Sequence, residues 1–350
     1  MTHGSQNNDR TGMTLPKLGV VIIGRNEGER LIRCIRSVKS ITDAIVYVDS
    51  GSIDGSVDAA RALGVDAMLL DTSIPFTAAR ARNAGFRRLV EYRPSIQFVQ
   101  FVDGDCEIVP GWLEAAMHEF ASREDAAVMC GRRRERFPEK SIYNRLCDME
   151  WNTPVGEAAA CGGDALMRRA FFEKVGGYSD HLIAGEEPEL CSRLRAAGWK
   201  VFRIDHEMTA HDAAMTRFGQ WWRRAVRAGY AYAAVSRLSG PERIRIWSRQ
   251  FFSNWFWGVL FPIAIIVTAL FFPWASLILL AGYLVIGMRV YRWRRRKGDS
   301  PADSRLYAFF CVLAKFPHGQ GQLVYFRDRL FGRTGKLIEY KNAAMPSGES

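Results

Sequence analysis

Short apolar runs alternate with amphipathic stretches along the first third of the chain. The apolar runs predict buried strands, at residues 18–23, 44–48, 65–70 and 98–102. Between them, apolar residues recur at helical spacing, which predicts helices over residues 29–40, up to residue 63, and over residues 77–90. Strands that alternate with helices indicate βαβ crossovers and a mainly parallel sheet, so the expected fold class is α/β.

Polar side chains follow these strands at the points where the strands end: Asn26, Asp49, Asp103 and Asp105. In parallel sheets, ligands collect at the carboxyl ends of the strands. Asp103 and Asp105 are one residue apart and point to the same side of an extended chain, with Gly104 allowing close approach between them. Two such carboxylates outline a site for Mg²⁺ or Mn²⁺ that would share phosphate oxygens with a ligand. A simple surface turn is the alternative, since Asp-Gly-Asp also favours turns.

Further strands are expected at residues 126–131 and 200–204. The arginine run at residues 132–134 is interpreted as a solvated edge of the sheet rather than a phosphate-binding patch. His206 and His211 follow the later strand.

A long uncharged segment, residues 251–288, dominates the second half of the chain. At 1.5 Å per residue it provides two membrane spans of about 20 residues, or one span and a re-entrant helix, with a turn at residues 273–276. The alternatives are a buried core hairpin and a single long span. Arginines flank both ends, which predicts that both ends lie on the cytoplasmic side. Residues 306–316 are too short to span and are expected to form an interfacial or re-entrant helix.

The formal net charge of +11 would suit a nucleic acid, a phosphorylated ligand or an anionic membrane. Because many of the arginines flank the uncharged segment, membrane lipids explain the charge and no nucleic-acid partner is required. Seven scattered cysteines without a C-x-x-C pair are typical of a reduced compartment. The N-terminus has no apolar signal-peptide region, so the chain is expected to begin in the cytosol.

The order of the polar motifs resembles that of family 2 glycosyltransferases with the GT-A fold. The motifs stand at residues 22–27, 48–55, 82–83 and 102–105, and the resemblance covers roughly residues 18–211. It implies that the donor nucleotide sugar is bound by Asn26, Glu27, Asp49, Arg82 and Asp103. It also implies that Asp103 and Asp105 bind the divalent metal, Mg²⁺ or Mn²⁺. Arg80 and Arg82 could offset phosphate charge, although either arginine alone fits a solvated helix face.

The segment at residues 185–194 resembles the acceptor half of this family, where a helix begins just after an acidic pair. The second acid would be the base, and here it is Glu187 instead of the family's aspartate. Pro188 is expected at the first helical position, which puts Glu187 near the N-cap, where the helix dipole favours its charged form. Glu187 would then be a weak base unless burial raises its pKa, and a purely helix-capping role is the alternative. Glu186 is expected to orient the reacting groups.

The resemblance suggests three more candidates. His211 would complete the metal site, and Asp164 could contact the sugar or the acceptor. Residues 220–224 resemble the Q-x-x-R-W motif of processive synthases, so Gln220 and Arg223 could reach the diphosphate or the acceptor. Arg224 replaces the tryptophan of that motif, which argues against a long-chain processive polymerase.

These observations predict a polar tail (1–15), a GT-A domain (16–235), a basic interfacial segment (236–250), a transmembrane hairpin (251–291) and a basic C-terminal segment (292–350). The expected protein is a multi-pass protein of the cytoplasmic membrane with its catalytic domain in the cytoplasm. Its expected function is inverting transfer of a sugar from a nucleotide-sugar donor to a saccharide or lipid-linked acceptor, for example a polyprenyl-linked one. A membrane-bound nucleotidyltransferase and a non-catalytic sugar-nucleotide-binding scaffold are the rival hypotheses.

Overall fold

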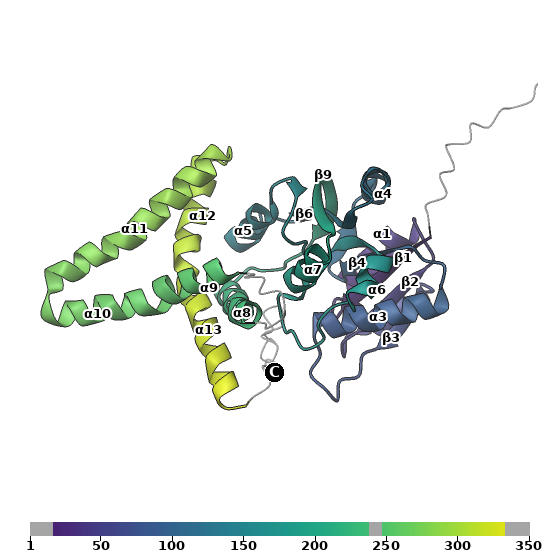
Figure 1. The fold of residues 1–350 in the computed structure, drawn as a ribbon, viewed down its shortest axis with the longest axis horizontal. Helices are drawn as coiled ribbons and strands as arrows, with labels where there is room; N and C mark the ends of the chain where they lie inside the picture. Colours follow the sequence, from purple (N-terminus) through teal and green to yellow (C-terminus); the bar gives the residue numbers. More distant parts are fainter. Residues whose placement is uncertain (1–16, 238–246, 333–350) are drawn as a thin grey trace, which may run out of the picture.

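The computed structural model describes residues 17–237 and 247–332 of the 350-residue chain. It shows an α/β domain from which a long helical arm extends (Figure 1). The predicted polar tail at residues 1–15 and the end of the chain lie outside the described residues.

One nine-stranded sheet forms the centre of the α/β domain. Its first half is parallel in the order β3-β2-β1-β4, with β1 (Leu18–Gly24), β2 (Ile45–Asp49), β3 (Asp66–Leu69) and β4 (Phe98–Asp103). The sheet continues beyond β4 through β8 (Ala165–Arg168), β6 (Ala126–Glu135), β9 (Lys200–His211) and β5 (Cys106–Ile108), and β7 (Gly156–Glu157) pairs with β9. Because β8 runs antiparallel to both of its neighbours, the predicted α/β class is confirmed with a mixed second half.

Helices cover both faces of the sheet: α1 (Glu29–Lys39), α2 (Ser56–Ala62), α3 (Ala78–Tyr92), α4 (Trp112–Ser122), α5 (Ile142–Trp151), α6 (Arg169–Lys174) and α7 (Glu186–Ala196). α3 lies especially close to the sheet, because a side-chain carbon at Gly85 would collide with Val21 and Val48. Val21, Val48 and Phe101 are completely buried and belong to one continuous apolar core. Burial of this apolar surface is the main stabilising contribution to the domain.

Two strands are longer than the sequence predicts. β6 extends to Glu135 and β9 to His211, and the two strands pair in parallel along most of their length. Arg133, His206 and His211 therefore lie within strands, although the sequence placed them after strand ends. α8 (Phe218–Ser236) follows β9 and leads toward the arm.

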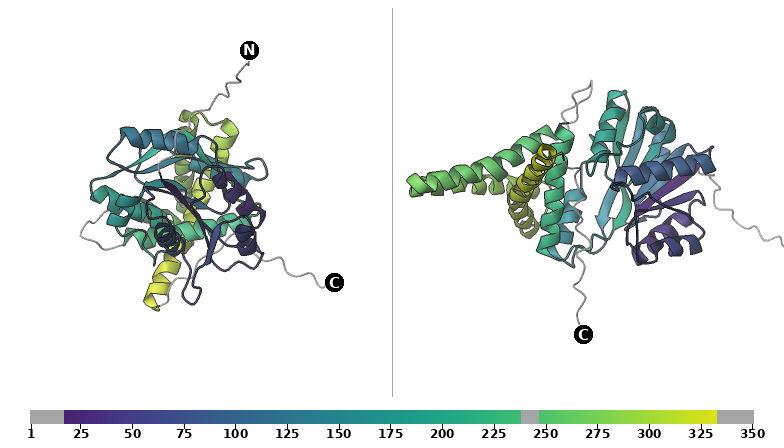
Figure 2. Two further views of the ribbon diagram at one scale, coloured as in Figure 1. Left: turned by 90° about the vertical axis from the view of Figure 1, so that its right-hand side faces the viewer. Right: turned by 90° about the horizontal axis from the view of Figure 1, so that it is seen from below.

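The helical arm is a hairpin that projects away from the α/β domain (Figure 2). Its outgoing part comprises α9 (Ser248–Trp255), a π-helical turn η1 (Phe256–Leu260) and α10 (Phe261–Phe271), and α11 (Pro273–Arg296) returns. The segments Ser248–Phe271 and Pro273–Arg296 are each long and apolar enough to cross a membrane, by length and composition. Leu270 and Leu284 are 75% and 76% exposed, so the alternative of a buried core hairpin is wrong.

The base of the arm is crossed by α12 (Pro301–Leu313) and α13 (Lys315–Leu330). α12 ends at Leu313, Ala314 separates the two helices, and Pro317 lies in the first turn of α13. Glycines bring α13 into backbone contact with two neighbours. A side-chain carbon at Gly229 of α8 would collide with the carbonyl oxygen of His318, and one at Gly258 of η1 would collide with the carbonyl oxygen of Lys315. α13 therefore packs directly against both α8 and the arm.

Candidate active site

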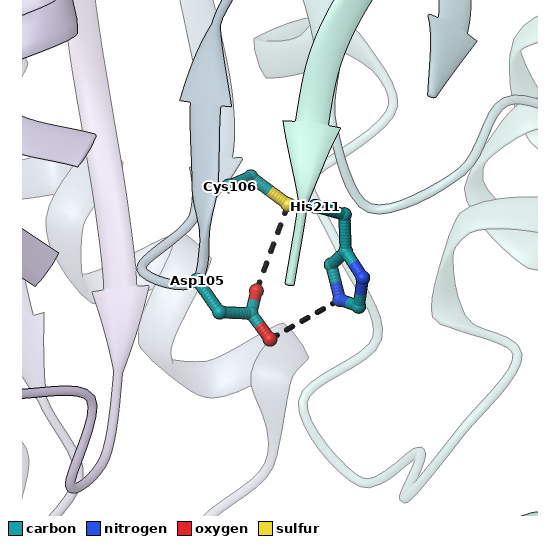
Figure 3. A group of neighbouring side chains, drawn as sticks. All are labelled: Asp105, Cys106 and His211. Atoms are coloured by element: carbon teal, nitrogen blue, oxygen red, sulfur yellow. Dashed lines mark hydrogen bonds and ion pairs between the residues drawn. The ribbon is translucent and has the colours of Figure 1, made fainter. Parts of the chain in front are cut away.

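The two carboxylates of the Asp-Gly-Asp turn lie between β4 and β5. β5 pairs with the end of β9 so that Cys106 is directly opposite His211. This pairing places Nε2 of His211 3.1 Å from Oδ2 of Asp105, and both side chains are buried (Figure 3). The structure therefore brings Asp105 and His211 together, as the sequence analysis expected.

The donor atoms around Asp105 fit a divalent cation. Ligand atoms of Asp105, Cys106 and His211 all lie within 4.8 Å of one another, as do those of Asp103, Cys106 and Asp164. Carboxylates and imidazole are suitable ligands for Mn²⁺, and carboxylates for Mg²⁺. The thiol sulfur of Cys106 is a soft ligand, which suits Mg²⁺ or Mn²⁺ less well than a carboxylate does. Asp105 and His211 are therefore residues that could hold the metal, and Asp103, which belongs to the second group, stays a predicted ligand.

Asp103 is held by two arginines. Arg82 Nη2 lies 2.9 Å from its Oδ1, and Arg133 Nη2 lies 3.2 Å from its Oδ2. Asp164 is fully buried beneath it, accepts a hydrogen bond from the Asp103 backbone N–H and pairs with Arg133 at 2.7 Å. In this structure Asp164 positions Asp103 and Arg133 instead of facing the cleft.

Arg133 is a site residue that the sequence analysis misassigned. Along β6, Arg132 and Arg134 pair with Asp148 on one side, whereas Arg133 points to the opposite side and reaches Asp103. The interpretation of residues 132–134 as a solvated edge is therefore wrong for Arg133. If the strand had been extended to these residues, the alternation of side chains between its two faces would have placed Arg133 opposite Arg132 and Arg134.

Arg82 also binds the acidic pair at the start of α7. Its Nη1 lies 2.9 Å from Glu186 Oε1 and 3.3 Å from Glu187 Oε1. Because the Arg82 side chain is 3% exposed, the solvated-helix interpretation does not hold for this residue. By contrast, Arg80 donates to backbone carbonyls of Asp71, Ile74 and Pro75, away from the carboxylates.

The helix containing the acidic pair begins two residues earlier than predicted. Gly185 is the N-cap with a left-handed φ of 88°, Glu186 is the first helical residue and Pro188 is the third. Proline is still tolerated there, because backbone N–H groups of the first turn have no partner within the helix.

The environment of Glu187 makes it a stronger base than a free glutamate. Burial and the neighbouring Glu186 raise the pKa of Glu187 to about 7, although Arg82 acts in the opposite direction. A carboxylate with this pKa is partly ionised near neutral pH and can accept a proton. The condition stated from the sequence, that burial must raise the pKa, is fulfilled.

Asp49 and Asn26 shape the loops at the far end of the site. Asp49 is fully buried and accepts hydrogen bonds from the Tyr47 hydroxyl, the Gly51 and Ser52 N–H groups and the Ser52 hydroxyl. Asn26 adopts a positive φ of 54°, and its side chain accepts a hydrogen bond from the Ile53 N–H. Both side chains thus fix the loop conformations from within.

Gln220 does not reach the carboxylates. Its side-chain oxygen accepts hydrogen bonds from the backbone N–H groups of Thr216 and Arg217, so it caps α8. Neither Gln220 nor Arg223 lines the cleft described next, whereas Arg224 and Arg227 of the same helix do. Contact of Gln220 and Arg223 with the diphosphate or the acceptor stays a prediction.

A cleft of about 820 Å³ connects the carboxylates of the Asp-Gly-Asp turn with the acidic pair of α7. Its wall includes Glu27, Asp103, Asp105, Glu187 and His211, and it continues along α8 to side chains of α12 and α13. Glu27 also pairs with Arg30 at 2.8 Å. The sequence analysis did not identify Arg227 or Lys315 as lining residues, since their proximity depends on how the arm folds back.

Family models match most of the α/β domain. The model described as "Glycosyl transferase family 2" matches residues 19–176. A second model, described as "N-terminal domain of galactosyltransferase", matches residues 147–217.

Two characterised relatives are similar in sequence. Glycosyltransferase AglE of Haloferax volcanii is 25% identical over 248 residues, which are 67% of this chain and 79% of AglE. Succinoglycan biosynthesis protein ExoA of Rhizobium meliloti is 26% identical over 190 residues, which are 51% of this chain. The chain thus spans only 56% of the length of ExoA.

One solved structure is similar over nearly the whole chain. It is the mannosyltransferase PcManGT from Pyrobaculum calidifontis in complex with GDP-Man and Mn²⁺. The TM-score is 0.62 at 15% sequence identity, and the match covers 91% of this chain and 89% of PcManGT. The two chains therefore share a fold.

Proposed function

We propose that this chain, which has the GT-A fold, is a membrane-anchored inverting glycosyltransferase of family 2. In this proposal the donor is a nucleotide sugar and the acceptor is linked to the membrane, for example through a polyprenyl chain. The observation that carries the proposal is that one cleft contains both ends of the reaction: its wall includes Asp105, Glu187 and residues of α12 and α13 at the base of the arm.

The donor would bind at the Asp103 end of the cleft. Asp105, Asp103 and His211 would hold a divalent cation, in keeping with the Mn²⁺ and GDP-Man bound to PcManGT. When bound, such a cation offsets the diphosphate charge and stabilises the departing nucleoside diphosphate. The remaining donor residues would be Asn26, Glu27 and Asp49, with Asn26 and Asp49 acting through the loop conformations that they fix.

Arg82 would set the arrangement of the charged groups. It joins Asp103 on the donor side to Glu186 and Glu187 on the acceptor side, at 2.9 to 3.3 Å. Such charge-assisted contacts keep the carboxylates in fixed positions relative to each other. Glu186, which is 4% exposed, would orient Arg82 and Glu187 and is not expected to react.

Glu187 would act as the general base. It would take the proton from an acceptor hydroxyl, whose oxygen forms a bond to the anomeric carbon while the bond to the nucleoside diphosphate breaks. Attack from the face opposite the leaving group inverts the configuration at that carbon. The raised pKa of Glu187, about 7, supports this role over a purely capping one.

The arm would anchor the enzyme in the cytoplasmic membrane as a multi-pass hairpin. The two apolar helices and their exposed leucines support this part of the proposal. Arg292, Arg295 and Arg296 at the end of α11 fit a cytoplasmic return of the chain. We retain the division into a GT-A domain at residues 16–235, a hairpin at residues 251–291 and basic flanking segments as a prediction.

The test uses the purified full chain in lipid nanodiscs with Mn²⁺ or Mg²⁺ and a panel of nucleotide sugars. Release of nucleoside diphosphate from one donor is expected, with loss of release and of metal-dependent donor binding in Asp105→Ala. Glu187→Gln is expected to lose release but to keep donor binding. Absence of donor binding across the panel, with correctly folded protein, would refute the proposal.

A further inference from the structure

The cleft contains two cations whose charge is not balanced within the described residues. Lys315 of α13 donates hydrogen bonds to the neutral side chains of Ser253 and Asn254, at 3.1 and 3.0 Å. Arg227 of α8 contacts the carbonyl oxygen of Ile183 at 3.4 Å. In residues 17–237 and 247–332, neither cation forms an ion pair with a carboxylate, although both line the cleft.

This arrangement contrasts with that of three other arginines of the cleft. Arg82 and Arg133 are paired with the carboxylates of the catalytic end, and Arg224 is paired with Glu150 at 2.8 Å. Arg227 and Lys315 are half-buried. Partial loss of water around an unpaired charge is costly, so a ligand of opposite charge would be favoured beside them. Burial lowers the pKa of Lys315, as expected for a cation without a counter-ion.

The surroundings of Lys315 are apolar as well as basic. Tyr307, Phe310 and Ala314 precede Lys315 in the chain at the base of the arm, and all of them line the cleft. Burial and the nearby Lys315 and Arg224 lower the pKa of His318 to about 3, so His318 is neutral and adds no charge. A ligand that matches both features has an anionic head and an apolar chain.

We propose that Lys315 and Arg227 bind the phosphate group of a lipid-linked acceptor. This inference rests on the proposed function in one respect, namely that the acceptor is a membrane lipid. Arg227 and the acidic pair line the same cleft, and Ile183, which Arg227 contacts, is four positions before Glu187 in the chain. The phosphate would therefore be held beside the acceptor end of the cleft, while the metal-binding carboxylates remain available to the donor diphosphate.

The test measures binding of farnesyl diphosphate to the full chain in nanodiscs of zwitterionic phosphatidylcholine. Trp221 and Trp247 line the cleft, so their fluorescence reports occupancy. Lys315→Gln and Arg227→Gln are each expected to weaken binding about tenfold or more, because each removes one charge-assisted contact. Lys315→Arg keeps the charge and is expected to restore most of the affinity.

Arg329→Gln is the matched control for loss of one positive charge. Arg329 is on the same helix as Lys315 but is exposed, and its recorded contact is with the Tyr325 hydroxyl. Binding to this variant should equal that of the unaltered chain. Melting temperatures of all variants show that they fold, and Arg227→Gln carries the test if Lys315→Gln loosens the contacts with Ser253 and Asn254.

Two further probes distinguish the sources of the phosphate. Inorganic pyrophosphate and farnesol are each expected to bind more weakly than farnesyl diphosphate. Pyrophosphate binding as tight as that of farnesyl diphosphate would overturn the lipid assignment, and equally tight farnesol binding would overturn the phosphate site. Unchanged affinity for farnesyl diphosphate in both Lys315→Gln and Arg227→Gln would also overturn the phosphate site. Donor binding and nucleoside diphosphate release are recorded separately, so failure of this site is distinguishable from failure of the proposed function.

Discussion

The acidic pair at the start of α7 allows a quantitative prediction about pH dependence. Replacing Glu186 by glutamine keeps the size of the side chain and an oxygen that can accept from Arg82, but removes one negative charge. Loss of a neighbouring negative charge favours the ionised form of Glu187, so its pKa must fall. The acidic limb of the rate profile should therefore move to lower pH.

The structure gives the magnitude. Glu186 Oε1 and Glu187 Oε1 contact the same nitrogen of Arg82 at 2.9 and 3.3 Å, so they are at most about 6 Å apart. At an effective dielectric constant of about 20, two charges at this distance repel by about 3 kcal/mol, which corresponds to about two pKa units. The pKa of Glu187 would fall from about 7 toward about 5.

The assay is the pH profile of kcat/KM for nucleoside diphosphate release, with the acceptor or with water as the nucleophile. At pH 6 the ionised fraction of Glu187 should rise from about one tenth to about nine tenths. Above pH 8 the variant should be slower than the unaltered enzyme, because a carboxylate of lower pKa is a weaker base.

Glu189→Gln is the matched control, because Glu189 lies in the same helical turn but pairs with Arg193 and Ser179 instead of Arg82. Its acidic limb should stay in place. A limb that is unmoved in Glu186→Gln, or that moves to higher pH, would refute the reasoning about the acidic pair.

Three other predictions follow from the described contacts. Asp105→Asn should weaken Mn²⁺-dependent donor binding by at least about tenfold in calorimetry, while binding without metal is unchanged. Arg82→Met leaves three carboxylates without their shared cation and should lower the free energy of unfolding by about 3–5 kcal/mol in denaturant titration. Gly229→Ala should destabilise the protein by about 1–3 kcal/mol through collision with the His318 backbone, whereas Gly219→Ala on the same helix should be tolerated.

Much of the fold could be predicted from local patterns. The strands that became β1, β2 and β4 are short apolar runs, and their ends carry the polar residues that meet at one edge of the sheet. The closeness of Asp105 and His211 followed from the family resemblance. Periodicity alone could not give it, because the two residues lie on strands that pair only in the folded sheet.

The misassignments have physical causes. Arg133 was grouped with its neighbours because strand β6 was expected to end before it. Side chains alternate between the two faces of a sheet only within a strand, so the three arginines were not assigned to different faces. Gln220 matched a family motif; in the structure it is the third residue of α8 and caps that helix, and its contact with the diphosphate or acceptor stays untested. No sequence pattern indicated that Lys315 lines the cleft, because its position there depends on how the chain returns across the base of the arm.

The glycine contacts of α13 have a consequence for how the enzyme would meet its acceptor. Direct backbone contact at Gly229 and Gly258 resists sliding of α13 past its neighbours, so we expect α8, η1 and α13 to move together. With the arm in the membrane as proposed, the catalytic carboxylates would stay at a constant height above the lipid surface. The reach of the acceptor's head group, and not bending of the enzyme, would then select which acceptors are glycosylated.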